Sequence, residues 1–496
     1  MKKLLYLALS ISLASSTLTS CINLESEMYD VINPGIFPKN EADAKALVTA
    51  AAYGPFRSNW YEGLFTSAWG GVQVHSEMTT DMADCQWDDV VWPDLINVNF
   101  TPNSPGPVRV YDYVRDISKM TLTIDRVNKV VMADETKARL IGELRCAKGW
   151  LGYILYDLFG GVPVASLEQL NRPMDTEMIP RLSSKEMFSF IETELKEAIK
   201  VLPANYKKGD SEYGRFTAGL AYTILMKLYM HDQKWAEAES CGRELMKATY
   251  GYALVDHYKD IFTLENEKNA EIIWACQCDL VTNKELWQAH VLPSMYPTKN
   301  PSIQKWSGYR MPWSFYNTFD KADERLQVLV GDFVGTDGIR YNETTPGTVL
   351  KKGALPIKVG EDPVATGEAS QVDWVVYRYA DVITLLSEAI VRKGNTVTQE
   401  AVDLLNMVRK RAGITEYKLS DITNVQDFMD KVLLNRGQEL WFEGARRTDL
   451  IRHGKYIEFA KKYKGSITAK DYMTLMPLPQ KAINEGQGKI IQNPGY

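Results

Sequence analysis

The stretch Val376–Ala412, VYRYADVITLLSEAIVRKGNTVTQEAVDLLNMVRKRA, carries the signal that decides the fold. Its apolar residues recur at steps of three or four positions, which is typical of helices that bury one face. The two runs are Val376, Tyr379, Ile383, Leu386 and Ile390, then Ala401, Leu404, Leu405 and Val408. Gly394-Asn395 lies between them and is typical of a turn. The stretch therefore predicts two helices joined by a short connection.

A second helix pair is predicted upstream. Phe216–Met230 and Trp235–Met246 have the same helical pattern and are separated by a break at residues 231–234. Both pairs resemble helix–turn–helix tetratricopeptide units, without a clean consensus repeat. Further helices are predicted at residues 140–158 and at Met187–Ile199. Because such units bury one face only when they stack, we predict a mainly α fold of stacked helix pairs.

Two segments interrupt the helical pattern. Residues 60–107 show no sustained period, and residues 269–372 are rich in Pro, Gly and aromatic residues, with strand-like runs such as Ile272–Trp274. Segments of this length in a compact protein are usually functional or disordered, and the aromatic content argues against disorder. We predict a single domain over residues 41–496. Its helical scaffold comprises residues 108–268 and 373–496, and the two interrupting segments are loop-rich excursions from it.

The N-terminus predicts export and lipid anchoring. Two lysines precede an apolar stretch at residues 4–13, and Leu18-Thr19-Ser20-Cys21 closes the segment. This order is that of a secretory signal, and the apolar stretch is too short to span a bilayer. Its last four residues resemble a lipobox, so we predict a signal peptide at residues 1–20 and a lipidated Cys21 on a flexible tether, residues 21–40. The alternative is an ordinary secretory signal with an unrelated cysteine.

The composition argues against several classes of protein. A net charge of −6 with interleaved signs does not suit nucleic-acid binding. The cysteines beyond Cys21 are widely scattered, which predicts no disulfide framework, and we interpret Cys276 and Cys278 as buried thiols. The acidic group Asp81–Asp89 is an alternative as a Ca²⁺ site but lacks the EF-hand order. We find no HExxH, GxSxG, P-loop or dinucleotide motif, and we predict no metal and no cofactor.

Several motifs between residue 140 and the C-terminus identify a family. They are Leu144-Arg145-Cys146-Ala147 through Phe159-Gly160-Gly161-Val162-Pro163, Tyr377-Arg378-Tyr379-Ala380-Asp381 with Ser387-Glu388-Ala389, Asn406-Met407-Val408-Arg409-Lys410-Arg411-Ala412-Gly413, Arg436–Arg452, and the ending Met476–Gln480 with Gln492–Tyr496. In this order they resemble the blocks of the SusD/RagB family of outer-membrane nutrient-binding lipoproteins.

The resemblance implies a function. SusD-like proteins of Bacteroidetes capture glycans at the cell surface and act as the lid of a SusC-like TonB-dependent outer-membrane transporter. We therefore expect a lipid-anchored protein of the outer membrane that binds an oligosaccharide or polysaccharide and is not an enzyme. The alternative within the family is a RagB-like, peptide-binding protein on the same scaffold. The acids after Cys21 also resemble surface-export signals of such lipoproteins.

In the family, loops from the two interrupting segments form the glycan face. Planar aromatic rings suit the flat C–H faces of sugars, and polar side chains orient the hydroxyl groups. The candidates in the first segment are Trp69, Trp87 and Trp92 with Asp81 and Asp88, in a region that also contains Trp60. The candidates in the second segment are Trp287, Tyr296, Trp306, Tyr309 and Trp313. The alternative for each tryptophan is that it packs its loop onto the scaffold.

Two places in the sequence offer carboxylates that could act in catalysis. Glu439 and Glu443 are spaced as a pair of carboxylates, but each has an arginine three residues away, which favours the ionised form. The signs of charge alternate along Arg436–Arg452, which predicts opposite charges paired on one helical face. A hydrolase that uses Asp81–Asp89 is the other alternative. We predict no catalytic residue.

Overall fold

The computed structural model describes residues 37–496 except 61, 90, 173, 175 and 176. The predicted signal peptide, the lipidated Cys21 and most of the tether lie outside the described residues.

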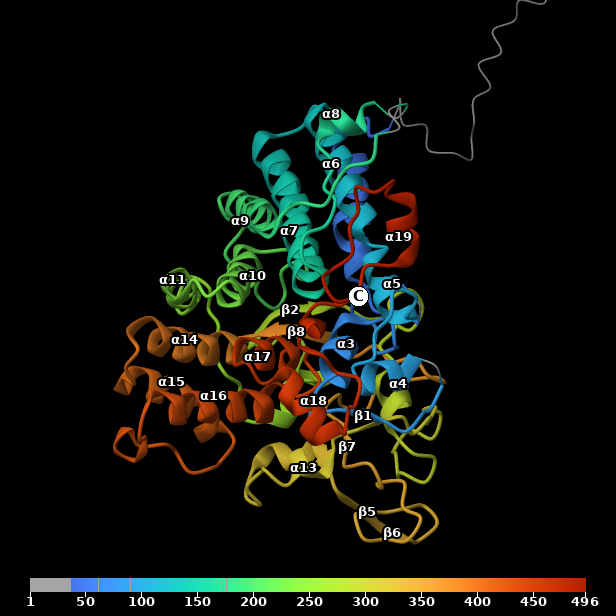
Figure 1. The fold of residues 1–496 in the computed structure, drawn as a ribbon, viewed down its shortest axis with the longest axis vertical. Coiled ribbons are helices and arrows are strands. Elements are labelled where there is room, and N and C mark those ends of the chain that lie inside the picture. The colour runs from blue at the N-terminus through green and yellow to red at the C-terminus, as the bar shows by residue number, and fades with distance from the viewer. Residues whose placement is uncertain (1–36, 61, 90, 173, 175–176) are drawn as a thin grey trace, which may run out of the picture.

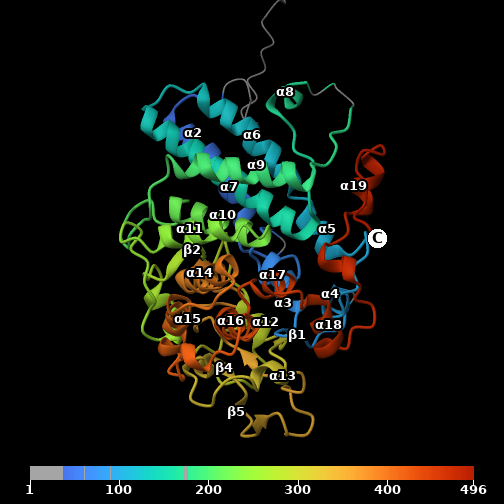
Figure 2. The same ribbon diagram turned by 60° about the vertical axis from the view of Figure 1, so that its left-hand side comes forward.

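A stack of helices forms the scaffold, and each helix packs on the next one in the stack (Figures 1 and 2). In order they are α6 (Val114–Asn128), α7 (Asp134–Phe159), α9 (Ser184–Ile199), α10 (Ala218–His231), α11 (Trp235–Leu245), α14 (Tyr379–Gly394), α15 (Gln399–Arg411) and α16 (Val425–Leu440). Figure 2 shows the stack running from α6 at the top to α16 in the lower half of the molecule. The predicted mainly α fold of stacked helix pairs is confirmed.

The two predicted pairs are α10 with α11 and α14 with α15, and α11 packs against α14 to join them. Thr217 caps α10 and Thr398 caps α15, because each side chain accepts a backbone N–H from the first turn. Asn395 ends α14 in the left-handed conformation. One detail differs from the sequence pattern, since Val376 belongs to a strand and the helix begins at Tyr379.

The strands are short and pair antiparallel in twos. β2 (Ile272–Cys276) pairs with β8 (Trp374–Arg378), β4 (Leu329–Val330) with β7 (Leu355–Pro356), and β5 (Asp332–Val334) with β6 (Arg340–Asn342). The strand-like run at Ile272–Trp274 is therefore confirmed as part of β2. The β5–β6 hairpin lies at the lower end of the molecule in Figure 1, at the opposite end from α6. The helices of the stack lie outside residues 269–372, which contain these strands from β2 to β7.

Residues 60–107 contain more regular structure than the sequence indicated. They include α3 (Val72–Met78), the short strand β1 (Asp84–Cys85), α4 (Val91–Ile96) and the start of α5 (Pro105–Tyr111). Every residue of α3 is buried. A helix that is covered on all sides has no apolar stripe, so no helical period was visible in the sequence.

The remaining elements cover the stack. α2 (Glu41–Val48) begins at the cap Asn40, and its turns continue to residue 56. The other short helices are α8 (Leu167–Leu170), α12 (Trp287–Val291), α13 (Trp313–Tyr316), α17 (Arg446–Arg452), α18 (Tyr456–Lys464) and α19 (Gln480–Glu485). Within the described part of the chain, we find no helix that combines the length and the apolarity needed to cross a membrane.

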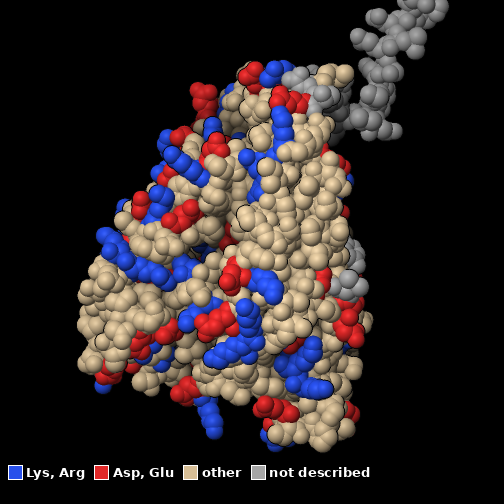
Figure 3. All heavy atoms as spheres, viewed as in Figure 1, with Lys and Arg blue, Asp and Glu red and all other residues tan. Residues whose placement is uncertain are grey.

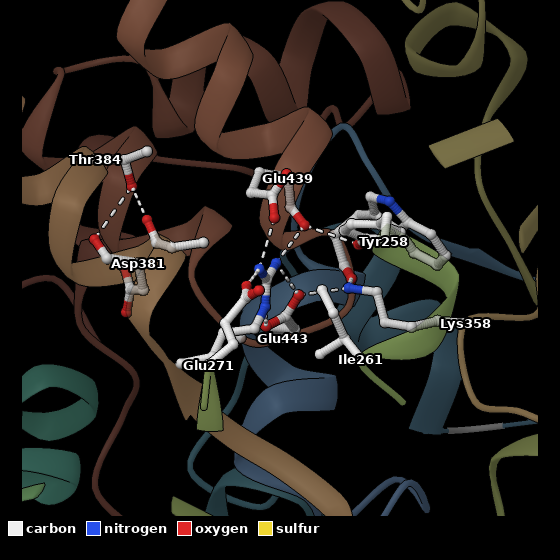
Figure 4. Close-up of polar contacts among 12 residues, drawn as sticks. Tyr258, Ile261, Glu271, Lys358, Asp381, Thr384, Glu439 and Glu443 are labelled. Atoms are coloured by element: carbon white, nitrogen blue, oxygen red, sulfur yellow. Dashed lines mark hydrogen bonds and ion pairs between the residues drawn. The ribbon is translucent and has the colours of Figure 1, made fainter. Parts of the chain in front are cut away.

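A buried network of ion pairs connects the excursion to the C-terminal helices (Figure 4). Arg378, which is fully buried, donates to Glu271 and Glu439 at 2.6 Å and to Glu443 at 2.7 Å. Lys358 also donates to Glu443, at 2.6 Å. These residues come from β8, α16 and three loops, one of which directly precedes β2, so the network holds together segments that are distant in the sequence.

The charges of Arg436–Arg452 do not share one helical face, so the prediction was wrong for the stretch as a whole, although Asp449 and Arg452 of α17 do pair on one face, at 2.7 Å. α16 ends at Leu440, and the chain turns through Phe442 and Gly444, which have φ angles of 56° and 83°. Arg436 pairs with Asp381 and Asp449 at 2.8 Å, and its partners therefore lie on α14 and α17. The turn is the reason, because it separates residues that a continuous helix would have aligned.

The network makes the stability of the fold depend on pH in the acidic range. Burial alone would raise the pKa of Glu439, but the guanidinium groups of Arg411, Arg378 and Arg325 outweigh burial and lower it to about 2. A carboxyl whose pKa is depressed in the folded state stabilises the fold above its unfolded pKa, near 4.5. This stability is lost as the pH falls from about 5 to about 2. We expect the free energy of unfolding, measured with urea at each pH, to fall across this window.

Replacing Glu439 removes the titrating group, so the Glu439→Gln variant provides the control for this pH series. Its free energy of unfolding should be lower at neutral pH but should change less between pH 5 and pH 2. Equal slopes for the two proteins in this window would contradict the assignment.

Candidate ligand-binding surface

A two-stranded ladder joins the two segments that were predicted to carry the ligand face. β1 pairs antiparallel with β3 (Tyr309–Arg310), with Asp84 opposite Arg310 and Cys85 opposite Tyr309. The Gln86 N–H continues the ladder by donating to the Gly308 carbonyl at 2.9 Å. Aromatic residues that lie more than two hundred positions apart in the sequence therefore meet at this ladder.

Three half-buried tryptophans, Trp60, Trp87 and Trp306, form the tryptophan cluster. The ring centroids of Trp60 and Trp306 are 5.0 Å apart, and the rings are tilted by 46°. The Trp87 indole N–H donates to the Trp306 carbonyl at 3.2 Å. The Trp87 ring also lies against Gly308, where an added Cβ would be 2.5 Å from it. Trp87 therefore supports the loop that carries Trp306, and Trp60 and Trp306 form the pair of rings at this surface.

Buried aromatic rings pack against the inner side of the tryptophan cluster. The His290 ring stacks on Tyr309 at 5.1 Å with an interplanar angle of 5°, and it meets Trp306 edge-on at 5.1 Å. Burial lowers the pKa of His290 to about 4, so its imidazole is neutral at physiological pH. The Ser67 hydroxyl lies 3.2 Å from its Nδ1 atom. A neutral ring in fixed position provides a rigid base for Trp306.

Polar groups border the tryptophan cluster. The Trp60 indole N–H donates to the Glu368 carboxylate at 3.2 Å. The Gln304 backbone N–H donates to the Gly367 carbonyl at 2.7 Å, which brings the loop that carries Glu368 next to the loop that carries Trp306. Nearby in sequence, the Lys305 ammonium donates to the Tyr296 carbonyl at 2.7 Å, and partial burial lowers the pKa of this lysine. The side chain of Gln304 is exposed.

Four of the sequence-predicted site residues are buried, which removes them from the candidate surface. Trp92, Trp287 and Tyr309 are 3%, 1% and 0% exposed. Their rings pack against each other and against the core, because Tyr309 lies 5.3 Å from Trp92 and 5.4 Å from Trp287. The carboxylate of Asp81 accepts from the Arg446 guanidinium at 2.9 and 2.8 Å. Asp81 anchors α17, and these four residues offer no free face or carboxylate to a ligand.

Of the other predicted residues, Trp87 and Trp306 belong to the tryptophan cluster. The remaining four are partly or fully exposed but lie outside it. Trp69 packs under Arg109, whose Cζ atom is 5.8 Å from the Trp69 ring centroid. The Trp313 indole N–H donates to the Leu350 carbonyl at 2.9 Å. Tyr296 contacts Phe333 of the β5–β6 hairpin at 5.1 Å between ring centroids. Asp88 is exposed and follows Trp87 in the sequence.

Two residues of the surface were not among the predicted site residues. Trp60 belongs to the same aperiodic segment as Trp69, Trp87 and Trp92, and its neighbour Glu368 has no distinguishing signal in the sequence. The contact of Trp60 with Trp306 depends on the meeting of two segments, so local pattern could not identify it.

The architecture defines the class of this protein. It is a helical scaffold of stacked tetratricopeptide-type pairs, with excursions made of loops and short strands. Two family models match the chain: the SusD family over residues 329–496, and a family described as starch-binding and associating with the outer membrane over residues 57–230. The chain belongs to the SusD/RagB family.

Relatives match the chain over nearly its whole length. SusD-like protein P38 of Formosa agariphila is 23% identical over 486 residues, covering 90% of this chain and 91% of its own. The starch-binding protein SusD of Bacteroides thetaiotaomicron is 22% identical, covering 100% and 99%. Among solved structures, the surface glycan-binding protein A of Bacteroides thetaiotaomicron in complex with laminarihexaose has a TM-score of 0.73 at 18% identity, covering 92% and 100%. This likeness shows a shared fold.

Proposed function

We propose that this protein is a cell-surface glycan-binding lipoprotein that captures an oligosaccharide and delivers it to a SusC-like TonB-dependent transporter, for which it acts as the lid. The observation that carries the proposal is the pair of half-buried rings of Trp60 and Trp306, which two separate loop segments bring within 5.0 Å of each other. Rigid aromatic faces cover the C–H faces of sugar rings at low entropic cost. The adjacent Glu368 supplies a hydroxyl acceptor.

The names of the relatives support a carbohydrate ligand. One relative is a starch-binding protein, and one structure with the same fold contains laminarihexaose. One matching family is described as associating with the outer membrane, which supports the surface location.

The surroundings of the carboxylates support binding without catalysis. Glu439 and Glu443 are 0% and 9% exposed, and arginine and lysine side chains occupy their oxygens. Asp81, from the acidic group that was considered for hydrolysis, is likewise paired with Arg446. These groups are engaged in holding the fold together.

The ligand class is tested by applying the same purified protein to a glycan array and to a peptide library. We expect retention of one glycan class and no retention of peptides. We further expect that the bound oligosaccharide keeps its length after a long incubation, as seen by chromatography. Retention of peptides alone, or the appearance of shorter products, would refute the proposal.

The proposal also includes an anchor in the outer leaflet, through lipid on Cys21. A tethered lid leaves its transporter and returns without loss, because the tether keeps its local concentration high. Protease treatment of intact cells should remove the wild-type protein, and a Cys21→Ser variant should leave the membrane fraction. A wild-type protein that resists the protease on intact cells, but not after lysis, would contradict the surface location.

A further inference from the structure

A second cavity lies on the C-terminal side of the scaffold, apart from the tryptophan cluster. It has a volume of about 300 Å³ and lies between α13, α16, the start of α17 and α18. This volume is at the lower end of the range for small-molecule sites in proteins. Its apolar lining consists of Phe315, Leu433, Leu434, Phe459 and Tyr463.

The inner wall of this cavity is a fixed cation between aromatic rings. The Cζ atom of Arg446 lies 5.2 Å from the ring centroid of Phe315 and 5.9 Å from that of Phe459. The guanidinium cannot turn toward a ligand, because it donates to both oxygens of Asp81 and to the Leu433 carbonyl. The inner wall therefore presents aromatic ring faces to a ligand, and the charge of Arg446 is already paired with that of Asp81.

The rim of the cavity offers one available cation. The Lys455 ammonium is paired with Glu458 at 3.3 Å. Asp430, another carboxylate of the lining, accepts from the Gln426 amide at 2.9 Å. The Lys462 ammonium lies 4.9 Å from the Tyr463 ring centroid, and in the described part of the chain we find no carboxylate in salt-bridge contact with it. Figure 3 shows Lys and Arg side chains, with Asp and Glu side chains among them, on the lower half of this face, where α17 and α18 lie in Figure 1.

We propose that this cavity is a binding site for a small aromatic carboxylate, whose ring packs against the rings of Phe315 and Phe459 and whose carboxylate meets Lys462. Aromatic rings attract each other in offset or edge-to-face arrangements at centroid distances of about 4.5–7 Å. An ammonium without an anionic partner forms a charge-assisted hydrogen bond to a carboxylate. This site is independent of the proposed glycan function, because it shares no residue with the tryptophan cluster.

The test measures the binding of 3-phenylpropanoate to the full protein by titration calorimetry, with 3-phenylpropan-1-ol and hexanoate as comparison ligands. A ligand of this size should bind with a Kd on the order of 1 mM or tighter. The alcohol, which lacks the charge, and hexanoate, which lacks the ring, should each bind at least fivefold more weakly.

Two pairs of variants locate the site. Ser314 is exposed and lines the cavity, so Ser314→Trp should fill it and weaken 3-phenylpropanoate binding at least tenfold, whereas Ser314→Ala should leave it unchanged. Lys462→Gln should weaken binding of the carboxylate by about five- to tenfold but should leave the alcohol unaffected. The neighbouring Lys461→Gln makes the same charge change away from the cavity and should have no effect.

If 3-phenylpropanoate shows no binding at concentrations up to about 10 mM, which is 10-fold above the expected Kd, the proposal is overturned. Binding that Ser314→Trp leaves intact would also overturn it, as would equal losses for Lys462→Gln and Lys461→Gln, which would indicate general charge attraction. Because Ser314, Lys461 and Lys462 are exposed, all four variants should fold, and their unfolding temperatures verify this.

Discussion

Replacing Glu439 with Gln should lower the free energy of unfolding by about 3–5 kcal/mol, the usual cost of removing one partner from a buried ion pair. Glu439 is fully buried, and its carboxylate accepts from Arg378 at 2.6 Å and from Arg325 at 3.2 Å. Arg411 donates to it as well. Glutamine keeps the shape of the side chain but removes the negative charge, so three buried guanidinium groups lose an anion that compensates them.

Urea unfolding followed by circular dichroism measures this change, with Asp430→Asn as the matched control. Asp430 lies on the same helix, α16, but is exposed, and its carboxylate accepts a hydrogen bond from the neutral Gln426 amide. Its replacement should alter the free energy by less than about 0.5 kcal/mol. If the two variants lost similar stability, the network would not be the element that holds the C-terminal helices to the excursion.

Replacing Trp306 with Ala should weaken binding of the cognate oligosaccharide at least tenfold, which corresponds to about 1.4 kcal/mol or more. The substitution removes one of the two rings of the surface and leaves the Trp60 ring without its neighbour at 5.0 Å. Trp87→Ala should weaken binding as well, because the Trp87 ring supports the loop that carries Trp306.

Titration calorimetry with the glycan found on the array measures this loss, and Trp313→Ala is the matched control. Trp313 belongs to the same excursion and is also half-buried, but its indole N–H donates to the Leu350 carbonyl and not to a residue of the tryptophan cluster. Full affinity in Trp306→Ala, or a loss confined to Trp313→Ala, would mean that the ligand lies elsewhere. Unchanged circular dichroism of each variant ensures that the affinities compare folded proteins.

Trp92 and Trp306 differ in exposure, and the sequence alone did not reveal this difference. Both tryptophans occur in aperiodic segments, and nothing in their local sequence distinguishes them. The structure buries Trp92 against Tyr309 and leaves Trp306 half-exposed beside Trp60. Exposure is decided by side chains from another segment, so local sequence could not distinguish the buried Trp92 from the half-buried Trp306.

The sequence by itself determined the helical scaffold and the family. Helical period depends on residues three or four positions apart, so the pairs α10–α11 and α14–α15 could be predicted from local pattern. The order of the motifs identified the family without any knowledge of contacts. The strand β2 was visible for the same reason, as a short apolar run.

Only the tertiary structure decided which charges pair and which aromatic rings meet. Glu439 was expected to pair with Arg436 on one helix, but its partners Arg378, Arg411 and Arg325 come from three other segments. Likewise, the β1–β3 ladder brings Trp87 and Trp306 together across the chain, and Trp60 packs against Trp306 from a third segment. Both outcomes depend on how separate segments pack, because burial and Coulomb attraction act through space and leave no periodic trace in the sequence.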